Sequence, residues 1–153
     1  RPGSLEVPGV LFAAAGCGVE RAAAAMEGLP EIALSHDNCH HQVILCGRAE
    51  SIEIARSRLT ASGVICQILP FRSGFHSPLF APFLDRPRAH FESLAVRAPE
   101  TPFWSATTCA PYPGEAAAVR ELALRHLVEP LRFREMVLAL FEQGVRKLQH
   151  ATP

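Results

Sequence analysis

The chain has 153 residues, a length that suits one domain or a large part of one. Hydrophobic residues make up 48% of the chain, which is enough for a buried core, and charged residues make up 20%. Basic and acidic residues number 15 each, so the charge balance gives no support for a nucleic acid or a membrane surface as the partner.

Residues 9–70 alternate between short apolar runs and helical patterns. In chain order, we expect a strand over 9–15, a helix over 18–26, strands over 31–34 and 43–46, a helix over 50–61 and a strand over 64–69. The polar stretch 35–42 is expected to be a loop. This order of elements is that of the ferredoxin-like βαββαβ fold, so we predict a small α/β subdomain over 9–70, preceded by a cut end or linker over 1–8.

The pattern changes after Pro70. We expect a loop over 71–75, a helix from Ser77 towards Leu94 with a kink near Pro87, a strand over 102–107, helices over 115–127 and 133–143, and the start of a strand over 145–148. Ser77 is suited to cap the first of these helices, because serine is a favoured N-cap and proline follows it. These elements are too few for an independent fold, so residues 71–153 are expected to be part of a larger α/β subdomain.

The five cysteines are scattered, with no CxxC pair, so neither a disulfide framework nor a zinc site is indicated. A cluster of His36, Cys39, His40 and His41 is also a poor metal site, since adjacent ligands rarely fit one tetrahedral ion. We expect it to lie in a loop near the entrance to a site and to hold no metal. Cys39 as a nucleophile paired with His76 is a further alternative, but nothing around it supplies an oxyanion hole.

Both ends of the sequence resemble cuts in a longer polypeptide. The chain has no initiator methionine, and it stops shortly after an apolar segment begins at Val145. No apolar run approaches the length of a membrane span, and residues 1–10 lack the apolar core of a signal peptide. With the unpaired cysteines, this predicts a cytoplasmic protein without a membrane partner.

The segment 69–80 contains the strongest candidate for chemistry. His76 lies at the end of a loop, directly before the expected helix, where the backbone can hold it in reach of a neighbouring site as a general base. The alternative is a histidine that only caps the helix or completes the loop.

This segment resembles the Phe-His-Ser-Pro motif of acyltransferase domains in type I polyketide synthases and related malonyl transacylases, a resemblance that extends from about Gly9 to Gln149. Further segments match the family in the same order along the chain. Asn38 and residues 43–47 resemble the family's Asn-Ser-Pro…Val-Val-Ser-Gly stretch, residues 63–70 its Gly-Val…Leu-Pro strand, and residues 102–105 its Pro-Phe-Tyr-Ser strand. Residues 125–133 resemble its Arg-Asn-Leu-Arg-Glu-Pro-Val-Arg-Phe motif, and residues 142–145 resemble the turn before its last core strand. Several matches in order are more specific than any single one.

The resemblance implies a Ser/His dyad on a ferredoxin-like subdomain joined to an α/β-hydrolase-like large subdomain. A serine in a Gly-His-Ser-x-Gly turn attacks malonyl-CoA, and the histidine, here His76, takes its proton. The phosphopantetheine thiol of an acyl carrier protein then receives the acyl group, without a bound cofactor. A backbone carbonyl of the Arg-Asn-Leu motif orients the histidine in this family, and that position is His126 here, where a surface histidine is the alternative.

Two parts of the family's site have no counterpart in the chain. No Gly-x-Ser-x-Gly occurs, and no arginine can be assigned to the malonyl carboxylate. We therefore expect the serine to lie in the rest of the synthase chain, and this fragment alone to be inactive.

The resemblance also bears on the substrate. In the family, His-Ala-Phe-His before the helix correlates with malonyl and Tyr-Ala-Ser-His with methylmalonyl; this chain has Ser73-Gly74-Phe75-His76. Phe75 matches the malonyl form, and its ring would crowd an extra methyl, although Ser73 and Gly74 match neither form. We predict that Phe75, Ser73 and Asn38 line the substrate site.

Two further interpretations concern partners. Arg132, Arg134, Arg146 and Lys147 form a mild basic group that could meet an acidic carrier protein. The rival to a catalytic fragment is a stand-alone ferredoxin-like binding module. A fragment should leave an apolar surface exposed near His76, with possible self-association, whereas a binding module should cover its own core.

Overall fold

The computed structural model describes residues 6–97 and 99–146. Its first part contains β1 (Val10–Ala15), α1 (Val19–Met26), β2 (Ile32–Cys39), β3 (Gln42–Arg48), α2 (Ala49–Ala61) and β4 (Cys66–Leu69). The four strands form one antiparallel sheet in the order β2-β3-β1-β4. This is the ferredoxin-like topology, as predicted from the order of the elements.

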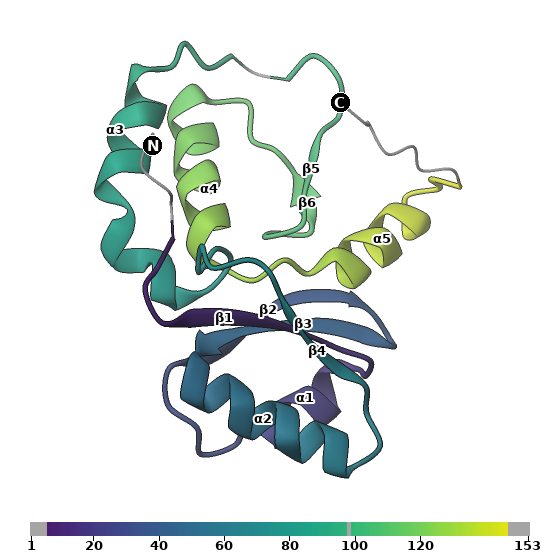
Figure 1. Ribbon diagram of the computed structural model, residues 1–153. Helices are drawn as coiled ribbons and strands as arrows, with labels where there is room; N and C mark the ends of the chain where they lie inside the picture. Colours follow the sequence, from purple (N-terminus) through teal and green to yellow (C-terminus); the bar gives the residue numbers. More distant parts are fainter. Residues whose placement is uncertain (1–5, 98, 147–153) are drawn as a thin grey trace.

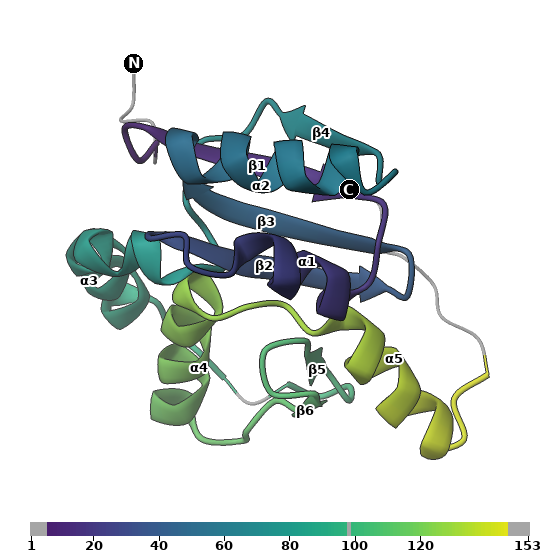
Figure 2. The ribbon, with the colours of Figure 1, turned by 90° about the horizontal axis from the view of Figure 1, so that it is seen from below.

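The sheet is covered on both faces. Figure 1 shows α1 and α2 against one face and the helices that follow β4 on the other side, and Figure 2 shows α1 and α2 lying over the sheet, roughly along its strands. Side chains of β1 alternate between the two layers: Leu11 and Ala13 join the core under α1 and α2, whereas Val10 and Phe12 join a second core around Phe80. A strand buried on both faces needs apolar residues at successive positions, which explains the continuous apolar run in the sequence.

The second part contains the 3-10 helix η1 (Pro78–Phe83), α3 (Asp85–Ser93), a two-stranded ribbon of β5 (Trp104–Ser105) and β6 (Ala110–Pro111), α4 (Ala116–Val128) and α5 (Phe133–Glu142). Helix α5 packs against β2, and α4 packs against η1. The two helices predicted over 115–127 and 133–143 thus hold this part of the chain over the second face of the sheet (Figure 1).

The predicted loop over 35–42 is wrong, because β2 continues to Cys39 and only His40 and His41 form the turn to β3. The polar residues of this stretch pair with β3, His36 opposite Ile44 and Asp37 opposite Val43. Asp37 is buried and bonded to Arg134. Arg134, which is distant in the chain, therefore pairs with the carboxylate of Asp37, although aspartate as a residue type favours loops.

The helix after Ser77 also differs from the prediction. It breaks at Leu84, between η1 and α3, and not near Pro87, which occupies the first turn of α3, where its missing N–H costs nothing. Ser77 occupies the N-cap position, but its hydroxyl donates to the carbonyl of Gly74 instead of capping the helix.

Two predicted strands are corrected as well. The strand over 102–107 is only β5, because the chain turns back into β6, with the amide of Cys109 donating to the carbonyl of Ser105. Val145 and Arg146 are not in a strand, and residues 147 and 148 of that expected strand lie outside the described residues. In the described ranges, no helix combines the length and hydropathy needed to cross a membrane.

Gly47 marks a close approach between β3 and the start of β2. A Cβ atom there would lie 2.9 Å from Ile32 Cγ1 and 3.0 Å from the carbonyl oxygen of Glu31. We expect Gly47→Ala to lower the free energy of unfolding by about 1–3 kcal/mol, measured by urea denaturation. Gly114→Ala is the matched control, since nothing lies within 4 Å of its added Cβ. Equal effects of the two variants would contradict this packing.

Candidate active site

His76 is held by its backbone and by its ring at the C-terminal end of α4. Its amide donates to the carbonyl of Leu127 at 2.8 Å, and its Nδ1 lies 2.6 Å from the carbonyl oxygen of His126. Its φ of 58° lies in the left-handed region, which costs a non-glycine residue about 1 kcal/mol. Such strain persists only where surrounding contacts impose it, and it is concentrated at functional sites.

The contact with His126 determines the protonation of the ring. A carbonyl oxygen can only accept a hydrogen bond, so Nδ1 of His76 carries the hydrogen and donates it. The Nε2 atom is left with a free lone pair, which is the form of imidazole that accepts a proton as a general base. The backbone of His126 therefore sets the tautomer of His76.

Burial lowers the pKa of His76 to about 4. The hydrogen bond to the His126 carbonyl opposes this shift, and the charges of His126 and His36 add smaller lowering effects. Burial also lowers the pKa of His36 and of His126. All three rings are consequently neutral at pH 7, and His76 is ready to accept a proton.

These lowered pKa values predict that stability falls in acid. Between pH 6.5 and about 4 the unfolded chain takes up a proton at His76 that the folded chain excludes, so the free energy of unfolding should decrease as the pH is lowered through this window. Urea denaturation at a series of pH values measures the decrease. His76→Asn should reduce it, and the same slope in the variant and the parent would refute the assignment.

A pocket of about 350 Å³ opens beside His76. Its lining includes all three residues predicted to contact the substrate, Asn38, Ser73 and Phe75, together with His76 itself. The remaining lining residues are Phe12, His36, Ile44, Leu69 and Phe71. The structure therefore gathers four of the five predicted site residues in one pocket, while the fifth, His126, contacts the ring of His76.

Local contacts fix the shape of this pocket. The Phe75 ring packs edge-on against the Phe80 ring at 4.6 Å, and its amide donates to Ser73 Oγ at 3.4 Å. Asn38 donates to Gln42 Oε1 at 3.0 Å across the β2–β3 turn. The apolar wall thus rests on the second core, and the polar lining comes from β2 and from the loop before η1.

His36 is a site residue that the sequence does not predict. The expected loop cluster includes it, whereas it lies on β2 and lines the pocket together with Asn38, two positions further along the strand. Period-2 alternation would have placed both on one face, had the strand been extended past Leu34. The other members of the cluster lie elsewhere: Cys39 is exposed, and His40 and His41 form the turn.

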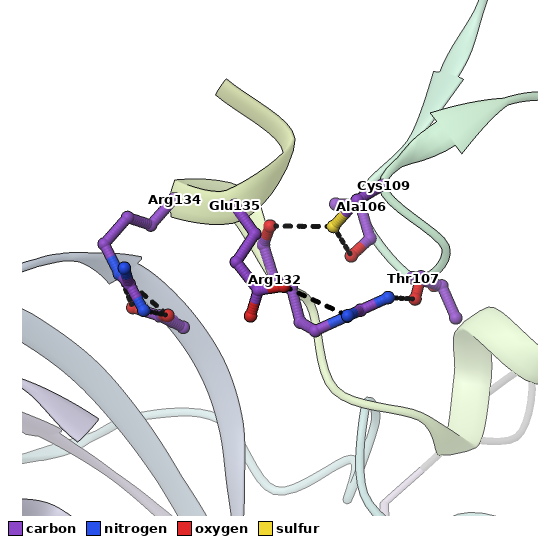
Figure 3. A network of polar contacts seen from close by, with 7 residues as sticks. Ala106, Thr107, Cys109, Arg132, Arg134 and Glu135 are labelled. Carbon is purple, nitrogen blue, oxygen red and sulfur yellow. Dashed lines mark hydrogen bonds and ion pairs between the residues drawn. The ribbon is translucent and has the colours of Figure 1, made fainter. Parts of the chain in front are cut away.

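The basic residues near the C-terminus are largely engaged within the chain. Arg134 forms a bidentate ion pair with Asp37. Arg132 bonds to Glu135 and to the carbonyl of Thr107, as Figure 3 shows. Arg146 lies over the ring of Phe141 at 4.1 Å. Lys147 is outside the described residues. Arg132 and Arg134 thus stabilise the fold, which weakens their interpretation as a carrier-protein contact.

No model of a known protein family matches the chain. Individual proteins do match: polyketide biosynthesis protein ThaF of Burkholderia thailandensis is 36% identical over 104 residues, which are 68% of this chain and 9% of that protein. The malonyl CoA-acyl carrier protein transacylase of Bacillus subtilis is 26% identical over 115 residues, which are 74% of this chain and 36% of that enzyme. The chain therefore spans well under half the length of these relatives.

A solved structure agrees with these matches. The acyltransferase domain of the iterative polyketide synthase in enediyne biosynthesis is 26% identical, with a TM-score of 0.76 over 86% of this chain and 34% of that one. The names of the Bacillus subtilis enzyme and of this domain both give acyl transfer as their chemistry, and ThaF is named for polyketide biosynthesis. The chain belongs to the acyltransferase family, which includes the acyltransferase domains of polyketide synthases and the malonyl-CoA:acyl carrier protein transacylases.

Proposed function

We propose that this chain supplies the general base of an acyltransferase that loads malonyl units from malonyl-CoA onto an acyl carrier protein, in polyketide or fatty acid biosynthesis. The observation that carries the proposal is the hydrogen bond from His76 Nδ1 to the His126 carbonyl, which leaves Nε2 free to accept a proton beside a pocket. The name of the Bacillus subtilis relative supports malonyl-CoA as donor and the carrier protein as acceptor.

In the proposed reaction, the nucleophilic serine comes from a segment outside the 153 residues. Nε2 of His76 accepts the serine proton while Oγ bonds to the thioester carbon, and the coenzyme A sulfur leaves with that proton. The phosphopantetheine thiol of the carrier then gives its proton to His76 and attacks the acyl-serine, which regains its hydroxyl hydrogen. Each half-reaction returns His76 to its neutral form.

Phe75 is the proposed determinant of the acyl group. Its ring lines the pocket beside His76 and is braced by Phe80, so an added methyl on the acyl unit meets a fixed wall. A single methyl contributes about 1–3 kcal/mol of discrimination. Competition between malonyl-CoA and methylmalonyl-CoA in the complete domain measures this, and equal use of the two thioesters would eliminate the steric role.

The exposed apolar surface favours a catalytic fragment over a self-contained binding module. Phe71, which lines the pocket beside His76, is 60% exposed, and α5 exposes Phe133, Leu138 and Phe141. We propose that a serine-bearing segment covers this surface. In this proposal residues 9–70 belong to the small subdomain and residues 71–153 to the large subdomain, and the protein is cytoplasmic. Without that segment, the chain is expected to self-associate.

An acyl-transfer assay tests the proposal. The chain alone, given malonyl-CoA and a phosphopantetheinylated carrier protein, should transfer no acyl group. The complete domain, in which this chain is joined to the serine-bearing segment, should do so. Steady transfer by the isolated chain would contradict the need for the external serine, and no transfer by the complete domain would overturn the proposed function.

A further inference from the structure

His76 is in contact with two other imidazole rings. Its ring centroid lies 4.8 Å from that of His126 and 5.0 Å from that of His36, and both pairs are nearly perpendicular. His126 acts on His76 through its backbone carbonyl. His36 approaches from a different part of the chain, from β2, and lines the same pocket as His76.

The backbone holds His36 firmly at this place. The residues on both sides of it bond to Leu131: the Leu131 amide donates to the carbonyl of Ser35, and the Asp37 amide donates to the carbonyl of Leu131. The sheet register also shifts between Leu34 and His36. Such an irregularity re-aims a side chain, and here the side chain reaches the pocket.

Ser35 links the ring of His36 to the loop that carries His76. Its buried hydroxyl donates to the carbonyl of Phe75 at 3.2 Å, so it can only accept from Nδ1 of His36, which lies 2.9 Å away. His36 is therefore protonated on Nδ1 when neutral. One hydrogen-bonded chain thus runs from His36 through Ser35 to the residue preceding His76.

A metal does not explain this arrangement. Over residues 6–97 and 99–146, no group of three histidine, cysteine, aspartate or glutamate side chains could hold an ion. The titratable groups that face His76 are His36 from β2 and His126 from α4. The contact is consequently one of packing and electrostatics between imidazoles.

We propose that His36 is a positioning residue for His76: its ring, locked by Ser35, fixes the orientation of the His76 ring and limits its access to water. This rests on the proposed function for its catalytic meaning, but the contact itself is a property of the chain alone. Neutrality of His36 is part of the role, because a charge at 5.0 Å would oppose proton uptake by His76.

Proton titration of the imidazoles by NMR in the 153-residue chain tests the proposal without needing the serine. His36→Ala should raise the pKa of His76 by about one pH unit, because water reaches its ring and because the positive charge that His36 carries in the acid range where His76 titrates is removed. His36→Phe, which retains a ring at this position, should give less than half of that rise. Nitrogen shifts should report hydrogen on Nδ1 of both His36 and His76 in the parent chain.

His40→Ala is the matched control, since His40 lies in the adjacent turn and should leave the pKa of His76 unchanged. If His36→Ala does not fold, Ser35→Ala replaces it, and the Nδ1 tautomer of His36 should then be lost. An unchanged titration of His76 in His36→Ala, or an unchanged tautomer in Ser35→Ala, would overturn the role. Either result concerns the role of His36 alone, because acyl transfer by the complete domain is tested separately.

Discussion

His76→Asn should lower acyl transfer by the complete domain about 10²- to 10⁴-fold, the range that a general base contributes. Asparagine adopts a positive φ more readily than other non-glycine residues, so the backbone at 58° should survive the change. Its amide cannot accept the serine proton. The loss should therefore fall on kcat, with KM for malonyl-CoA little changed.

Single-turnover measurement of acyl-serine formation gives the most direct reading of this loss. His90→Asn is the matched control, because His90 is exposed on α3 and has no predicted part in the reaction. It should retain full activity. Acyl-serine formation at more than half the parental rate in His76→Asn would contradict a general base at this position.

The order of elements in the first half of the chain could be predicted from the sequence, because both strands of the apolar centre, β1 and β3, are buried on two faces and read as continuous runs. The extent of β2 could not be predicted from the sequence. Its second half consists of Ser35 to Cys39, whose types favour loops, and it is held in the sheet by Phe75, Leu131 and Arg134. Those partners are distant in sequence, so no local pattern reveals them.

The candidate site, too, could be predicted from the sequence only in part. The position of His76 before a helix is visible in the sequence, and the family resemblance pointed to the backbone of His126. The positive φ of His76 and its contact with His36 arise only when β2, the loop before η1 and the end of α4 meet. His36 could not be predicted as a site residue, because the expected loop over 35–42 takes the place of the second half of β2.

Asp37 and Arg134 connect β2 to α5, and their ion pair should be a main contributor to the stability of this site. The Asp37 side chain is 4% exposed, and Arg134 Nη2 donates to its Oδ2 at 2.7 Å. Removing one partner of a fully buried pair costs about 3–5 kcal/mol. Because Arg134 is 28% exposed and can regain water, we expect Asp37→Asn to cost less, about 2 kcal/mol.

The reverse change should be worse. Arg134→Met leaves the carboxylate of Asp37 buried without its partner, so it should lower the free energy of unfolding more than Asp37→Asn does, and the double variant should recover part of the loss. Urea denaturation at pH 7 measures all three. Glu53→Gln, which removes an exposed pair with Arg56, should change stability by less than about 1 kcal/mol. Additive effects of Asp37→Asn and Arg134→Met would refute the coupling. Coupled effects would support an ion pair that holds β2 against α5 at Asp37, next to His36, which faces His76.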